Sequence, residues 1–170
     1  MTKHVRNLTL SAMFLALGLV LPMAFHFFGP NAGGTFLPMH IPVLLCGFIC
    51  GPFYGALVGV LTPLLSSTLT GMPMMMPIGV SMMFELCTYG LLSGLLMKRL
   101  SLYTSLLLSM LAGRVVSGIT NLILLSFAGK AYSLSIFLSA AFVTAIPGII
   151  LQLITIPVLV KVAKKLNNEK

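Results

Sequence analysis

The sequence predicts an all-α integral membrane protein with six transmembrane helices and with both termini in the cytoplasm. Of its 170 residues, 58% are hydrophobic and only 7% are charged, against about 25% charged in an ordinary globular domain. No Asp, Glu, Lys or Arg occurs between Arg6 and Glu85. Because a spanning helix needs about 20 apolar residues, the chain has room for about six crossings in a single membrane domain, residues 1–170.

Proline, glycine and charged residues divide the apolar sequence into these six helices. The first is expected to remain as a span, because its apolar run is too long for a signal peptide and no A-x-A cleavage site follows. The second is short: its 14 residues at about 1.5 Å each reach about 21 Å of a hydrocarbon core of roughly 30 Å. In chain order, the helices are expected at residues 6–28, 37–50, 53–70, 78–98, 102–127 and 135–163.

The basic residues indicate the orientation of the chain. Only Lys130 falls on the side opposite the termini, and the basic residues on the side of the termini are Lys3, Arg6, Lys98, Arg99, Lys161, Lys164, Lys165 and Lys170. Lys and Arg concentrate in cytoplasmic connections, so both termini are expected in the cytoplasm. The external connections are then 29–36, 71–77 and 128–134, which are rich in Gly, Pro and Met.

Two formal charges, Glu85 and Arg114, lie inside predicted helices. Each would cost about 2.5–3.5 kcal/mol if it faced lipid at a helix centre, so both must face protein or water. Counted from the ends of their helices, the two residues lie at nearly the same depth. This predicts an ion pair between the fourth and fifth helices.

Polar side chains extend from each charge along one helix face. Ser81, Glu85, Thr88 and Tyr89 form one such stripe, and Arg114, Ser117 and Asn121 form the other. Their convergence below Gly-rich external connections favours a substrate pocket, and the alternative is an ion pair whose hydroxyl neighbours only fix the helix register. His40, at the external entrance of the second helix, is either a ligand-binding residue or a hydrogen-bonded helix end. Gln152 is assigned to packing or to conformational coupling.

Small residues at helical spacing predict close helix packing. Glycine recurs every four residues at Gly47, Gly51, Gly55 and Gly59 and again at Gly90 and Gly94, while Ala12 and Ala16 form a similar pair.

The three cysteines lie in apolar runs and are expected to be core residues. No metal-ligand spacing, catalytic set or phosphate-binding loop occurs, so no metal, cofactor or enzymatic activity is expected. The basic residues form no patch for nucleic acid.

Taken together, these features resemble the substrate-binding S components of energy-coupling factor (ECF) vitamin transporters. The resemblance rests on the length, the six helices, the N-in topology, the Ala12 and Ala16 pair and the stretch 37–65, LPMHIPVLLCGFICGPFYGALVGVLTPLL. It implies a bacterial plasma-membrane protein that captures a vitamin or precursor from outside. It also implies that residues 29–36 form a lid and that Ala12 and Ala16 contact a transmembrane T component, which two cytoplasmic ATPases drive.

The substrate depends on the state of Arg114. An arginine neutralised by Glu85 suits a neutral or zwitterionic compound, whereas a free arginine suits a carboxylate such as pantothenate, the first candidate; a pyridoxine-like, pyrimidine or deazapurine precursor comes next. Two other classes of function remain open. A structural scaffold subunit would explain the glycine packing, and a self-sufficient carrier would take up substrate without partner subunits.

Overall fold

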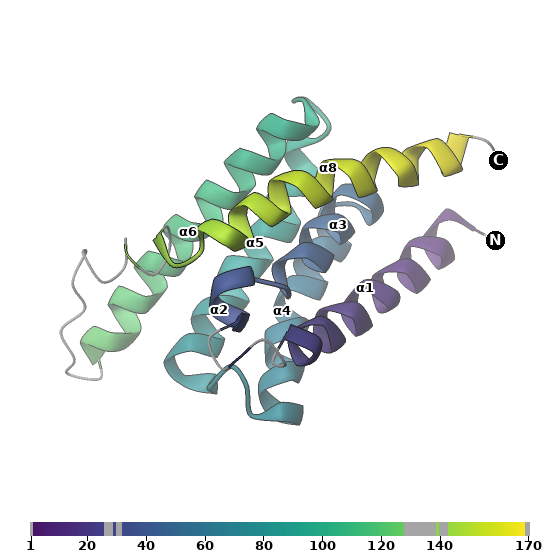
Figure 1. The fold of residues 1–170 in the computed structure, drawn as a ribbon. Coiled ribbons are helices and arrows are strands. Elements are labelled where there is room, and N and C mark those ends of the chain that lie inside the picture. Colours follow the sequence, from purple (N-terminus) through teal and green to yellow (C-terminus); the bar gives the residue numbers. More distant parts are fainter. Residues whose placement is uncertain (1, 26–28, 30–31, 128–138, 140–142, 169–170) are drawn as a thin grey trace.

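The computed structural model describes residues 2–25, 29, 32–127, 139 and 143–168, and in this part of the chain it contains helices and no strand. In chain order the elements are α1 (Lys3–Phe25), α2 (Ala32–Phe36), α3 (His40–Cys50), α4 (Pro52–Thr70), the π-helical turn η2 (Met75–Gly79), α5 (Val80–Leu96), α6 (Leu102–Phe127) and α8 (Ile146–Asn168). They include 6 stretches that are long and apolar enough to cross a membrane. The all-α, six-span prediction is confirmed, and both chain ends lie at the same end of the bundle (Figure 1).

The helix bounds agree best for α6, which covers the predicted 102–127. Helix α8 begins at Ile146, and residues 135–138 and 140–142 of the predicted last span lie outside the described part. Pro147 occupies the first turn of α8, where its missing N–H leaves no hydrogen bond unmade. The first helix is described as far as Phe25, and residues 26–28 of the predicted span lie outside the described part. The fourth span, predicted as 78–98, starts with the η2 turn and ends at Leu96.

The short second span consists of two helices rather than one. Helix α3 begins at His40 instead of 37, and it follows a bend in which Leu37 has a positive φ of 52°. Before the bend, α2, Ala32–Phe36, lies within residues 29–36, which were predicted as an external connection. Together the two helices give an apolar run of 18 residues, Gly33–Cys50, which is close to the length of a full crossing.

Glycines bring α3, α4 and α5 into backbone contact. A Cβ added at Gly90 of α5 would overlap the backbone of Gly55 and Ala56 on α4, and one at Gly59 would overlap Leu86. The predicted glycine packing is therefore confirmed, except at Gly51. That glycine has open space around it and a φ of 103°, so its role is to end α3 and allow the turn into α4.

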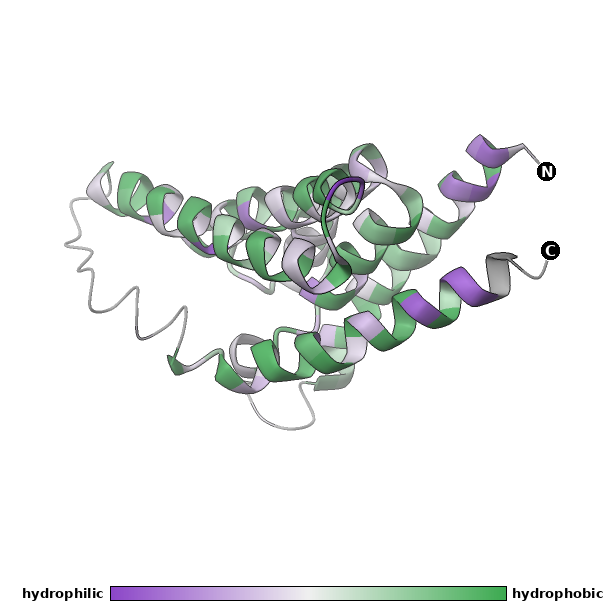
Figure 2. Ribbon diagram, turned by 90° about the horizontal axis from the view of Figure 1, so that it is seen from above, coloured by the Kyte–Doolittle hydropathy of each residue, from purple (hydrophilic) through white to green (hydrophobic). Residues whose placement is uncertain are grey.

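Helix α3 lies at the centre of the bundle and α1 lies at its edge. In the α3 span 67% of residues are buried, compared with 11% in α1. Helix α1 is fixed at its N-terminal half, where Asn7 Nδ2 donates to the carbonyl of Cys50 at 3.1 Å and Cys46 Sγ donates to Ser11 Oγ at 3.5 Å. Much of the rest of α1 is exposed and apolar, and the polar residues gather near the chain ends (Figure 2).

Candidate functional site

Glu85 is the centre of a buried polar cluster formed by α3, α5 and α6. Its Oε1 lies 3.0 Å from Nη1 of Arg114 and accepts a hydrogen bond of 3.0 Å from the hydroxyl of Tyr89, one turn along α5. Nε2 of His40, at the start of α3, lies 3.5 Å from the same oxygen. The ion pair predicted from the sequence is confirmed, and the side chain of Glu85 is only 4% exposed.

A second group of polar side chains joins α5 to α6 one turn away from Glu85. Asn121 Nδ2 donates to Ser81 Oγ at 2.6 Å and to the carbonyl of Ser117 at 3.0 Å. The hydroxyls of Ser81 and Ser117 are 3.0 Å apart. The two predicted stripes therefore do meet across the α5–α6 interface, with Ser81 and Ser117 buried.

Thr88 does not join this network. Its hydroxyl donates to the carbonyl of Phe84 on its own helix at 2.8 Å, so its hydrogen bond is local. Thr88 follows Glu85 by three residues, a spacing that predicts only the same general side of α5. Its side chain lies at the edge of the polar face rather than within the network.

Three residues on α3, α6 and α8 have buried polar side-chain atoms without hydrogen-bond partners among the described residues. The atoms are both ring nitrogens of His40, of which Nε2 faces Oε1 of Glu85, Nη2 of Arg114, and both Nε2 and Oε1 of Gln152. Native proteins leave few buried polar groups unpaired, and each one calls for an explanation such as an absent ligand or water. Gln152 was assigned from the sequence to packing or to conformational coupling.

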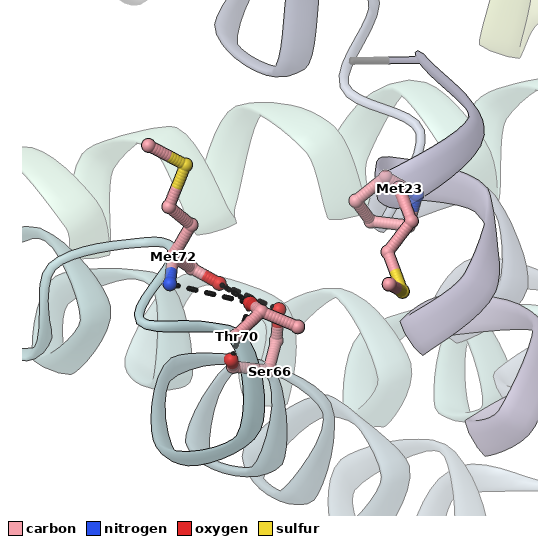
Figure 3. A pocket seen from close by; sticks show the side chains of 5 residues that line it. Met23, Ser66, Thr70 and Met72 are labelled. Carbon is pink, nitrogen blue, oxygen red and sulfur yellow. Dashed lines mark hydrogen bonds between the residues drawn. The ribbon is translucent and has the colours of Figure 1, made fainter. Parts of the chain in front are cut away.

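A pocket of about 270 Å³ lies elsewhere, between the C-terminal ends of α1 and α4 (Figure 3). Pro22, Met23, Ser66, Thr70 and Met72 line it. The hydroxyls of Ser66 and Thr70 already donate to the carbonyl of Met72, at 2.6 and 3.1 Å. Its walls therefore offer little for the recognition of a polar substrate, in contrast to the cluster around Glu85.

Within the described residues, no group of His, Cys, Asp and Glu side chains is arranged to hold a metal ion. Cys46, Cys50 and Cys87 are free thiols. The chemistry that this site offers is hydrogen bonding and charge pairing in a protein interior, which suits reversible binding of a small molecule.

Six apolar spans around buried charged and amide side chains define a membrane protein with a polar site inside its helix bundle. The family model described as "ECF transporter, substrate-specific component" matches residues 6–160, so the chain belongs to this family. The resemblance noted in the sequence is thereby confirmed, and the protein is a transporter subunit that acts with other subunits in a membrane. Comparisons with curated proteins and with solved structures found no significant match.

Proposed function

We propose that this S component captures a small vitamin or vitamin precursor from outside a bacterial cell and binds it at the Glu85–Arg114 cluster. The observation that supports this most is the convergence of Arg114, Tyr89 and His40 on one oxygen of Glu85. Buried polar groups that serve only packing are normally satisfied within the protein. Here Arg114 and His40 each retain unpartnered atoms.

Delivery requires partners in this proposal. The substrate passes to the cytoplasm with a T component and two ATPase subunits, and residues 29–36 act as the lid. Ala12 and Ala16 are both exposed on α1, as a docking face for the T component requires. The basic residues beside the chain ends support a cytoplasmic location for both termini.

The ion pair bears on the choice of substrate. Because Arg114 is neutralised by Glu85, the cluster favours a neutral or zwitterionic compound over a carboxylate. Pantothenate remains the carboxylate to test, since Nη2 of Arg114 has no partner among the described residues. Ligand screening should therefore include both classes.

The test is native mass spectrometry of the detergent-purified chain, followed by a thermal-shift screen of vitamins and precursors. A ligand that binds the folded state raises the unfolding midpoint by mass action. We expect one compound to co-purify or to stabilise the chain strongly, and Asn121→Leu and Arg114→Gln to abolish that effect. A chain that binds no compound but retains a membrane protein partner would contradict the proposal and favour a scaffold. Uptake by the chain alone in liposomes would favour a self-sufficient carrier.

A further inference from the structure

Gln152 lies on the buried side of α8, in a row of residues that are otherwise apolar or glycine. Gly148, one turn earlier, and Ile156 and Val160, on the following turns, are buried on the same side. Gln152 itself has an exposed fraction of 0%, and neither amide atom has a hydrogen-bond partner among the described residues. Burying an amide without partners costs free energy. An apolar side chain would therefore serve packing better at this position.

Neighbouring contacts show which helices this side of α8 packs against. A Cβ at Gly148 would lie 2.8 Å from backbone atoms of Thr35 and Phe36, so this turn of α8 lies against the end of α2. Ile156 belongs to the same core cluster as Val43 of α3. Gln152 lies one turn after Gly148 on the side of α8 that packs against α2 and α3, and His40 is the first residue of α3.

We infer that Gln152 determines substrate specificity, and that its carboxamide pairs with a neutral compound carrying a hydrogen-bond donor beside an acceptor, as in a lactam or a cyclic amide. A carboxamide offers one acceptor oxygen and one donor nitrogen side by side. A lactam edge matches both atoms at once. In the proposed substrate site, Glu85 and Arg114 neutralise each other, so the site carries no net charge that requires an ionic substrate. Because this role lies within the proposed substrate site, it depends on the proposed function.

His40 supports the same class of substrate. Its Nε2 faces Oε1 of Glu85 at 3.5 Å, its Nδ1 has no hydrogen-bond partner among the described residues, and its exposed fraction is 2%. In a neutral imidazole whose Nε2–H faces a carboxylate, Nδ1 is an acceptor. This acceptor on α3 and the carboxamide on α8 fit a planar heterocycle with polar atoms at its edge better than a flexible carboxylate.

The test measures binding to the purified full chain by thermal shift and calorimetry. The probes are 2-pyridone, uracil and nicotinamide, with N-methyl-2-pyridone as the analogue that lacks the lactam donor and pantothenate as the carboxylate. We expect the wild type to bind a lactam probe and to discriminate against its N-methyl analogue by about 10- to 100-fold, the value of one or two neutral hydrogen bonds. Gln152→Met should lower affinity for the lactam by a similar factor and remove the discrimination.

The unliganded variant distinguishes recognition from packing. Replacing unpartnered amide atoms with a similarly long apolar side chain should leave the unfolding midpoint unchanged or raise it. Gln152→Leu repeats the test if Gln152→Met does not fold. Thr155→Val is the matched control on α8, because the Thr155 hydroxyl donates to the carbonyl of Leu151 in its own helix at 2.7 Å. It should change neither affinity nor discrimination.

Each other outcome overturns the inference in a different way. If pantothenate binds and the lactam probes do not, the assignment of Gln152 fails and the proposed function stands. If no probe and no vitamin binds, both fail. If Gln152→Met lowers the midpoint of the unliganded chain and leaves discrimination intact, Gln152 has a structural role.

Discussion

At the scale of single residues, Glu85 holds the cluster together, because three side chains from three helices approach its Oε1. Removing one partner of a buried ion pair leaves an uncompensated charge, which costs about 3–5 kcal/mol. The carboxylate therefore links helix packing to the chemistry of the site.

Exchanging the two charges tests this link. Glu85→Arg or Arg114→Glu alone should lower the unfolding midpoint strongly, since each places two like charges together in the bundle. The double variant should recover a large part of the loss, as measured by thermal unfolding in detergent. Arg99→Gln, at an exposed helix end, is the control and should have little effect. If the double variant is no more stable than the single variants, the attraction between the two charges does not stabilise the fold.

The sequence predicted this pair, and the reason is physical. Two opposite charges in an apolar chain have no other partner that would make their burial tolerable. The sequence could not show that the Thr88 hydroxyl donates to a carbonyl of its own helix. Helical spacing places Thr88 near the edge of the polar face but does not show whether its side chain points toward α6. The sequence also could not show that Gln152 lacks a partner, because that depends on side chains contributed by other helices.

At the scale of elements, α4 and α5 touch backbone to backbone through Gly55 and Gly90. Gly90→Ala should therefore be severely destabilising, although alanine is the better helix former. The added methyl group meets the carbonyl of Gly55, which belongs to a helix and has no flexible atom to move aside. Gly34→Ala on α2 meets no atom within 4 Å and is the matched control. A thermal midpoint that is equal in the two variants would contradict the close packing.

Helix α2 depends on a glycine of α8 in the same way. Gly148→Ala should push the end of α2 away from α8, because the new Cβ would lie 2.8 Å from the backbone of Thr35 and Phe36. If residues 29–36 form the lid, bound substrate should dissociate faster, with a smaller effect on the stability of the unliganded chain. Stopped-flow or surface-based dissociation rates measure this. An unchanged rate would show that closure does not depend on this contact.

Element bounds were predictable where the sequence carries a clear boundary. The turn with Lys98 and Arg99 marked the start of α6 at residue 102, whereas no residue type marked the bend at Leu37, where a non-glycine residue has a positive φ. The sequence also did not show that Pro147 lies in the first turn of α8, which begins at Ile146. Proline in a first helical turn and proline at a kink look alike in a single sequence.

At the scale of the whole molecule, α1 presents an exposed face to its surroundings. Replacing both Ala12 and Ala16 with Leu should abolish transport by the assembled complex and leave substrate affinity nearly unchanged, because close approach of membrane helices depends on small residues. Uptake into cells and binding to the purified chain measure the two effects separately. Ala24→Leu, the same change at another exposed position of α1, is the control. Loss of affinity in the double variant would show instead that this face of α1 contributes to the substrate site.

The contacts among α3, α4 and α5 also have a mechanical consequence. Where side chains separate two helices, a load can be absorbed by rotamer changes, but at Gly90 there is no such layer between the backbones. Tightly packed interiors have low compressibility and transmit strain. A force applied at the C-terminal end of α5 is therefore expected to reach Glu85 with little loss, because the three helices resist deformation together.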